Sequence, residues 1–97
     1  MTFFTLSSPE EVESFSRLHF KEYDVLSSPR EQIRRKANLL KAVALESMNR
    51  AEVVLTFEDQ TSCKKIRSRI LATGDDQVML DKGFSIPIHC IHFVEFP

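Results

Sequence analysis

The chain has 97 residues, of which 42% are hydrophobic and 28% are charged, and its formal net charge at pH 7 is -1. This length accommodates one domain, and the small net charge provides no general attraction to nucleic acid or to an anionic membrane. There is no run of about 18 apolar residues that could span a bilayer, and the opening residues MTFFTLSS lack the basic segment of a signal peptide, so we expect a cytoplasmic protein.

Two helix starts are recognisable in the first half of the chain. The motifs S-P-E-E at residues 8–11 and S-P-R-E at residues 28–31 each place serine at the N-cap, proline at the first helical position and glutamate at the third. They predict helices over residues 9–23 and 29–48. Residues 1–6 precede them as a short apolar segment, predicted as an edge strand or as a tail packed on the core.

The second predicted helix is apolar over an unusually wide sector. Residues at three- and four-residue steps are Ile33, Ala37, Leu40, Ala44 and Met48. They are flanked by Leu39, Val43 and Leu45. This sector is wider than one contact surface requires. We expect the helix to be covered on two sides, either between the first helix and the sheet or in a homo-oligomer contact through Leu39, Val43 and Leu45.

After residue 50 the apolar residues alternate with a period of two, as in half-buried strands. The pattern predicts strands over residues 53–57, 64–72 and 77–81, a strand from residue 84, and a last strand over residues 91–96. Pro87 cannot donate a ladder hydrogen bond, and the apolar phase shifts after it, which predicts a break at residues 88–90. Four or five short antiparallel strands with tight turns favour a closed or nearly closed barrel.

The C-terminal half resembles a known family in several motifs. The residues concerned are Val-Val-Leu-Thr-Phe-Glu-Asp at 53–59, Gln-Val-Met-Leu at 77–80, and Ile86, Ile91 and Val94. In these motifs residues 51–96 are similar to the Sm-like small barrel of Sm, LSm and Hfq proteins, which has a leading helix and five bent strands. The Arg-Gly pair with which that family contacts RNA would fall at Pro87-Ile88, and Gln77 stands where Asn is usual.

The expected fold is therefore α+β and a single domain, residues 1–97. Two N-terminal helices, within residues 1–50, would pack on a C-terminal antiparallel barrel of four to five strands, Sm-like or SH3-like, within residues 51–97. The helices would cover the barrel.

Basic residues concentrate on one predicted strand and on the start of the second helix. Together they could follow a phosphate backbone, because Lys and Arg neutralise phosphates and release counterions. The alternative is a solvated surface balanced by nearby acidic residues, and no aromatic residue alternates with the cations of the strand to stack on bases. The predicted nucleic-acid-binding residues are Arg34, Arg35, Lys65, Arg67 and Arg69.

Ligand types for zinc occur at His89, Cys90 and His92, with His19 and Cys63 elsewhere. No C-x-x-C pair is present, and on a continuous strand His89 would face away from the other two, so we predict no metal and no cofactor. The two cysteines are expected to be reduced. A Cys-His nucleophile would need geometry that strand neighbours seldom reach, and two glycines are too few for an oxyanion or phosphate loop, so we predict no enzyme.

Two function hypotheses follow from these patterns. The first is a non-enzymatic regulatory or protein-interaction module that forms a homo-oligomer through the second helix. The alternative is an RNA- or DNA-binding adaptor that uses the basic strand and the basic helix start. Neither hypothesis involves a membrane.

Overall fold

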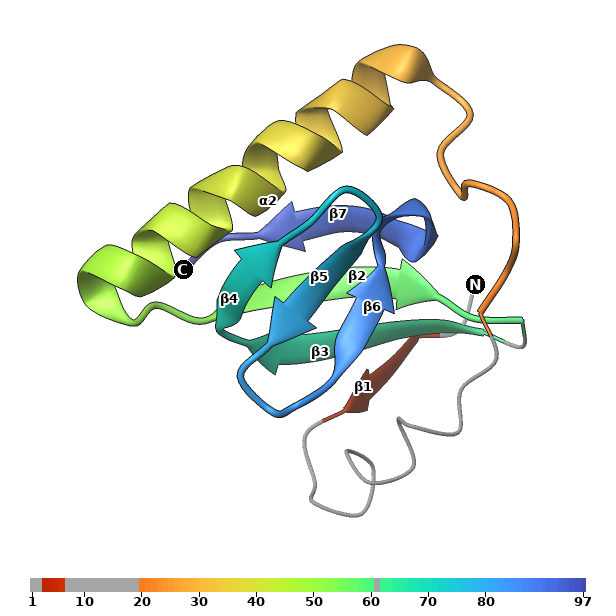
Figure 1. Ribbon diagram of the computed structural model, residues 1–97. Coiled ribbons are helices and arrows are strands. Elements are labelled where there is room, and N and C mark those ends of the chain that lie inside the picture. The colour runs from red at the N-terminus through yellow and green to blue at the C-terminus, as the bar shows by residue number, and fades with distance from the viewer. Residues whose placement is uncertain (1–2, 7–19, 61) are drawn as a thin grey trace.

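The computed structural model describes residues 3–6, 20–60 and 62–97, with the backbone alone for residues 3–6. The described chain folds into one long helix, one short 3-10 turn and seven strands (Figure 1). The helix α2 spans Pro29–Asn49. The strands and the turn η2 are β1 (Phe3–Leu6), β2 (Val53–Glu58), β3 (Cys63–Ser68), β4 (Ile70–Thr73), β5 (Gln77–Leu80), β6 (Ser85–Pro87), η2 (Ile88–Cys90) and β7 (Ile91–Glu95).

The strands form two sheets. One has the order β1-β3-β2-β7, with β1 parallel to β3 and the other pairs antiparallel. The other is antiparallel, with the order β4-β5-β6. Helix α2 packs on β4 and β7, which belong to different sheets, and so joins the two along one side of the molecule (Figure 1).

Both sheets and the helix contribute to one core. The four-stranded sheet supplies Leu55, Phe57 and Ile66, which are fully buried. The three-stranded sheet and the helix add fully or almost fully buried apolar side chains. These are Leu39, Ala42, Ile70, Val78, Leu80 and Ile86.

Helix α2 confirms the prediction from the S-P-R-E motif and ends one residue later than expected. Ser28 is the N-cap, and its Oγ accepts a hydrogen bond of 3.4 Å from the backbone N–H of Glu31. At the other end Arg50 adopts a left-handed conformation with φ of 54° and donates its backbone N–H to the carbonyl oxygen of Glu46. The cap residues therefore define both the start and the end of the helix.

Several strand predictions are also confirmed. Strands β2 and β5 lie where the period-two pattern placed them, and residues 3–6 form the edge strand β1. The predicted break after Pro87 is the 3-10 turn η2, and the last strand begins at Ile91 as expected. Proline therefore ends β6, because it has no N–H to continue the ladder.

The predicted fold class is wrong in two respects. The described residues contain one α-helix in place of two: of the predicted first helix, residues 9–19 lie outside the described residues, and residues 20–23 are not helical. The strands form two separate sheets and do not close into a barrel.

The second error is explained by a bend at Arg69. The predicted strand over residues 64–72 bends there and divides into β3 and β4, which belong to different sheets. The carbonyl oxygen of Arg69 accepts hydrogen bonds from Ser68 Oγ and from the backbone N–H of Asp81. The bond from Asp81 extends the antiparallel pairing of Ile70 with Leu80, so the chain joins the second sheet from Arg69 onward. Within the described residues, no helix is both long and apolar enough to cross a membrane.

Candidate functional site

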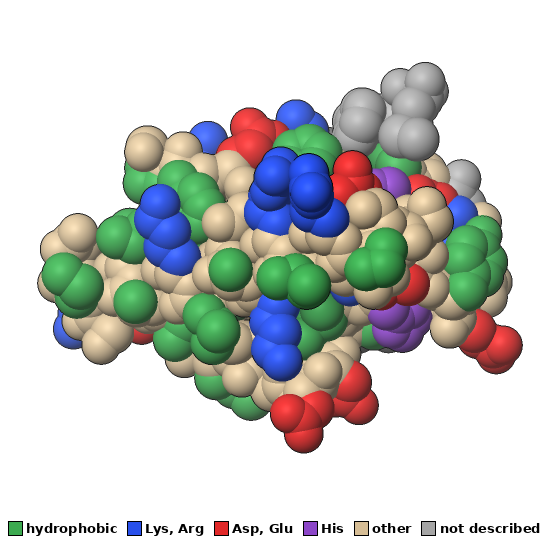
Figure 2. Space-filling model, turned by 90° about the horizontal axis from the view of Figure 1, so that it is seen from above, with side chains coloured by type: hydrophobic (Ala, Val, Ile, Leu, Met, Phe, Trp, Pro, Cys, Tyr) green, Lys and Arg blue, Asp and Glu red, His purple; other side chains and the backbone are tan. Residues whose placement is uncertain are grey.

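The outward face of helix α2 is apolar and exposed. Ile33 is 70% exposed, Leu40 53% and Met48 76%, and both intervening alanines are also exposed. At 3.6 residues per turn these positions lie on one line along the helix. We call this line the outer stripe; its residues are Ile33, Ala37, Leu40, Ala44 and Met48. Figure 2 looks onto the side of the molecule that carries α2 in Figure 1, and hydrophobic side chains lie there among lysines and arginines.

The opposite face of the helix is committed to the core. Leu39 and Ala42 are buried there, and Val43 packs against the core from the edge of this face. Leu45 is half-buried. The homo-oligomer contact was predicted through Leu39, Val43 and Leu45. Leu39 and Val43 instead pack in the core of a single chain. The apolar residues of α2 that remain available to another molecule are those of the outer stripe.

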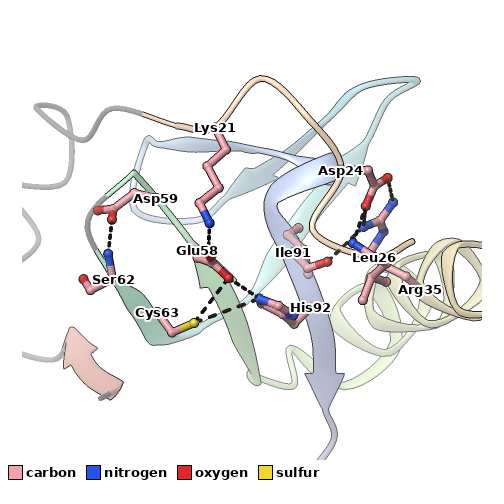
Figure 3. A network of polar contacts seen from close by, with 10 residues as sticks. All are labelled: Lys21, Asp24, Leu26, Arg35, Glu58, Asp59, Ser62, Cys63, Ile91 and His92. Carbon is pink, nitrogen blue, oxygen red and sulfur yellow. Dashed lines mark hydrogen bonds and ion pairs between the residues drawn. The ribbon is translucent and has the colours of Figure 1, made fainter. Parts of the chain in front are cut away.

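A buried arginine fixes which face of the helix turns inward. Arg35 is 6% exposed, and its guanidinium donates to both carboxylate oxygens of Asp24, at 2.9 and 2.7 Å, and to the carbonyl oxygen of Ile91 at 3.0 Å (Figure 3). This fork geometry is the strong form of a charged hydrogen bond. The guanidinium of Arg35 holds the pKa of Asp24 below its usual value. Arg35 therefore ties the helix to the segment before it and to β7.

Basic residues border the outer stripe on both flanks. Helical geometry places Lys36 on one flank and three further cations on the other. All four are exposed: Arg30, Arg34, Lys36 and Lys41. None of the ion pairs within the described residues involves any of them. The ammonium group of Lys41 instead lies 4.6 Å from the centre of the Phe96 ring. These side chains therefore add unneutralised positive charge along both edges of the stripe.

The acidic residues of α2 lie away from the stripe. Glu31 and Glu46 belong to the opposite side of the helix by their spacing from Leu40. One carboxylate approaches the stripe from another element: Asp75 lines, together with Ile33 and Lys36, a surface hollow of about 270 Å³. The outward face of α2 is therefore apolar along its centre and predominantly basic at its borders.

The predicted nucleic-acid-binding residues do not share one surface role. Arg34 and Arg67 are exposed. Arg35 is the buried residue just described. Arg69 pairs with Asp81 at 3.0 Å and with Glu46 at 3.7 Å, and Lys65 pairs with Glu95 at 3.4 Å. Three of the five cations are therefore neutralised by carboxylates within the chain.

A second group of reactive side chains lies where β2, β3 and β7 meet (Figure 3). Glu58 Oε1 is 2.7 Å from His92 Nε2 and 3.5 Å from Cys63 Sγ, and the sulfur and the imidazole nitrogen are 4.0 Å apart. We call these three residues the Glu58 cluster. The ammonium group of Lys21 pairs with the other oxygen of the carboxylate, Glu58 Oε2.

The strands bring this cluster together in two ways. Glu58 and Cys63 are direct partners in the β2–β3 ladder, so their side chains share one face of the sheet. His92 is the extra residue of a bulge in β7: Phe57 pairs with Ile91 and Thr56 with Phe93, and His92 lies between them. A bulge redirects the side chain of the inserted residue. Cys63 and His92 were recognised in the sequence as possible zinc ligands, but Glu58 was not.

The geometry of this cluster differs from that of a catalytic triad. Burial, together with the charges of Lys21 and Arg35, lowers the pKa of His92. One nitrogen, Nε2, faces both Glu58 and Cys63. A catalytic triad instead uses the two ring nitrogens separately, one for the nucleophile and one for the carboxylate.

The remaining sulfur and imidazole candidates lie apart from the cluster. His89 Nε2 and Cys90 Sγ both contact the carbonyl oxygen of Lys21. Cys90 is fully buried, and burial raises the pKa of its thiol, as expected for a cysteine that packs as a small hydrophobic residue. His19 lies outside the described residues.

Comparison of the chain with protein-family models, with curated proteins and with solved structures found no match. The resemblance to the Sm-like family stays a prediction.

Proposed function

We propose that this protein is a non-enzymatic interaction module whose outer stripe binds an acidic amphipathic helix of another protein. The observation that carries the proposal is the exposure of Ile33, Leu40 and Met48 along a helix whose other face is already buried. The stripe is about 22 Å long at 1.5 Å per residue. A contiguous apolar surface rimmed by polar residues on a small protein is typical of an interaction site.

The charges beside the stripe favour an acidic partner. A helix laid along α2 would place its apolar side chains on the stripe and its own flanks beside Lys36 on one edge and Arg34 and Lys41 on the other. Carboxylates at those positions would be attracted, whereas lysines or arginines would be repelled. The two alanines of the stripe allow close approach of such a helix. The hollow beside Ile33 offers space for one apolar side chain of the partner.

The same charges disfavour the predicted homo-oligomer. An antiparallel pair of outer stripes would place Lys41 near Lys41 of the other copy, because this residue lies close to the middle of the stripe. A parallel pair would place the Lys36 flank of one copy against the Arg34 flank of the other. Both arrangements bring cations together, so a second copy fits the stripe less well than an acidic helix does.

An anionic membrane would also attract basic residues beside an apolar stripe. Helices that lie on membranes usually carry bulky Trp, Phe or Leu side chains on their apolar face. Two of the five stripe residues are instead alanines, Ala37 and Ala44. This composition favours the close packing of another helix over insertion among lipid chains.

The expected affinity is modest. Full burial of one Ile, Leu or Met side chain contributes about 1.5–3 kcal/mol, and part of each stripe side chain is already shielded. Association costs about 4–15 kcal/mol in lost translational and rotational freedom. We therefore expect a dissociation constant in the micromolar range or above for a simple helical partner.

Fluorescence anisotropy with designed peptides tests the proposal. The probe is a labelled peptide of about 20 residues with leucines at three- and four-residue steps and glutamates elsewhere. One control peptide has lysine in place of every glutamate, and a second has the acidic composition in scrambled order. The acidic amphipathic peptide should bind, and both controls should bind at least several-fold more weakly.

Two variants locate the binding surface. Leu40→Glu should abolish binding of the acidic peptide, because it removes an apolar side chain from the middle of the stripe and adds a carboxylate that repels the glutamates of the peptide. The matched control is Leu71→Glu on β4, since Leu71 is 42% exposed and lies outside the stripe. No binding of the acidic peptide, equal binding of all three peptides, or equal weakening by both variants would contradict the proposal. Binding to phosphatidylserine vesicles without binding to the peptide would also contradict it.

Sedimentation velocity from about 1 µM to about 1 mM protein tests the homo-oligomer, because this range brackets a micromolar constant. We expect the monomer value throughout. A sedimentation coefficient that rises with concentration in the natural chain, but not in Leu40→Glu, would instead support pairing of two copies through the stripe.

The alternative function, a nucleic-acid-binding adaptor, has less support. Of the five residues that suggested it, only Arg34 and Arg67 are both exposed and outside every ion pair of the described residues. The cations beside the stripe could attract phosphate, but the side chains between them are aliphatic and cannot stack on bases. A gel-shift titration with mixed RNA and DNA at low salt tests this function; a complex that is lost in Arg67→Glu would support it.

A further inference from the structure

The Glu58 cluster presents three different metal-ligand types on one side of a sheet. Its carboxylate oxygen, thiol sulfur and imidazole nitrogen all lie within 4.8 Å of one another. The residues come from the end of β2, the start of β3 and the bulge of β7, and these strands are joined by backbone ladders. A rigid sheet therefore holds the three ligand atoms together, as a metal site requires.

We propose that Glu58, Cys63 and His92 bind a zinc-type divalent cation. Zinc is bound at about 2.3 Å by sulfur, about 2.0–2.1 Å by imidazole nitrogen and about 2.0–2.2 Å by carboxylate oxygen. A tetrahedral arrangement then separates the ligand atoms by about 3.3–3.7 Å. The sulfur–oxygen separation of 3.5 Å already meets this value, while the nitrogen–oxygen separation of 2.7 Å must open and the sulfur–nitrogen separation of 4.0 Å must close slightly.

The surroundings of the cluster suit such a cation. A metal would take Glu58 Oε1 and leave Oε2 to the ammonium group of Lys21, and a ligating carboxylate usually has such an outer partner. On binding, the Cys63 thiol would release its proton to solvent and coordinate as the thiolate. Three ligands from the described residues leave a position for water, whereas structural zinc sites are closed by four protein ligands.

The cluster is also partly open to solvent. The His92 side chain is 21% exposed and the Glu58 side chain 17%. A hydrated cation can therefore reach these two ligands from outside. The site uses no residue of the outer stripe, so it is independent of the helix binding proposed above.

Titration of the purified, untagged chain with zinc chloride and, separately, with cobalt chloride tests the proposal. Calorimetry should show one zinc ion per chain. Cobalt should produce a thiolate-to-cobalt charge-transfer band, which reports a Co–S bond directly in the natural chain. Cys63→Ser and His92→Gln should each weaken zinc binding by about tenfold or more, because loss of a ligand should cost at least as much as loss of an outer partner.

The matched control is Cys90→Ser, which changes the chain's other cysteine and leaves the cluster intact. It should retain the affinity for zinc and the cobalt band. The proposal is overturned if the natural chain gives no charge-transfer band, or if Cys63→Ser binds zinc as tightly as Cys90→Ser does. The band is measured on the natural protein, so the test holds even if a ligand variant fails to fold.

Discussion

The two faces of helix α2 reverse the usual relation between residue type and burial. The inner face buries the charged side chain of Arg35, whereas the outer face exposes Ile33, Leu40 and Met48. The arginine is tolerated inside because Asp24 and the carbonyl oxygen of Ile91 accept its hydrogen bonds. The outer apolar side chains have no comparable cover among the described residues of the chain. A charge is buried where its partners are present, and an apolar row is left exposed where another molecule can cover it.

The largest effect that tests this contrast comes from two neighbouring leucines. Leu39→Ala should lower the free energy of unfolding by about 2–5 kcal/mol, because it leaves a cavity in the core. Leu40→Ala should change it by about 0.5 kcal/mol or less, because its side chain is largely in solvent. Urea unfolding at low protein concentration, followed by circular dichroism, measures both. Equal losses would show that the two leucines do not lie on opposite faces of the helix.

An intermediate effect comes from removing the carboxylate that pairs with Arg35. Asp24→Asn should destabilise the fold by about 1–3 kcal/mol at neutral pH, because it weakens the support of a buried charge. The Arg35 guanidinium lowers the pKa of Asp24 in the folded state. The folded chain therefore binds this proton less readily than the unfolded chain, whose Asp pKa is about 3.9. The stabilisation is present above that pH and is lost as the pH falls through the folded pKa.

Unfolding free energies between pH 7 and pH 2 measure this contribution of Asp24. The variant should lose less stability on acidification than the natural chain does. Asp75→Asn is the control, because Asp75 is an exposed turn residue. If Asp24→Asn and Asp75→Asn have the same acid dependence as the natural chain, the pair between Arg35 and Asp24 contributes nothing to stability.

The sequence predicted those parts of the fold that depend on neighbouring residues. Ser28 and Pro29 defined the start of α2, and Pro87 indicated the break before β7, since capping and the missing N–H of proline act locally. The bend at Arg69 was missed because it depends on a hydrogen bond from the backbone of Asp81, twelve residues later. The alternating pattern continues through that bend, so pattern alone cannot show it.

The orientation of α2 was not predictable from its apolar pattern, because apolar residues lie on both of its faces. Arg35 was assigned to a basic surface, and one of its acceptors, Ile91, comes from a distant part of the chain. The Glu58 cluster was partly predictable from the sequence. Glu58 and Cys63 close the hairpin between β2 and β3, so the register of the hairpin alone would have paired them. The position of His92 depends on a bulge, which no residue in β7 indicates.

The smallest effect concerns the cations beside the outer stripe. Lys36→Glu should weaken binding of the acidic peptide by about two- to thirtyfold, because it removes one exposed attraction and adds one repulsion of about 0.2–1 kcal/mol each. For the same reason it should strengthen binding of the lysine peptide. Anisotropy at low ionic strength is the appropriate measurement, since salt screens exposed charges.

Arg67→Glu is the control for this small effect. It changes the net charge by the same amount as Lys36→Glu, but at an exposed position on β3, away from α2. If the peptide were attracted only by the net charge of the protein, both variants would bind the acidic peptide more weakly and to the same extent. A larger loss in Lys36→Glu therefore reports carboxylates that lie beside that flank, and equal losses would contradict a helix laid along α2. Leu40→Glu, compared with its charge-matched control Leu71→Glu, tests the apolar contact. Both results together require one partner that covers the stripe and places its acidic residues at the edges. The exposure of the stripe alone does not require such a partner.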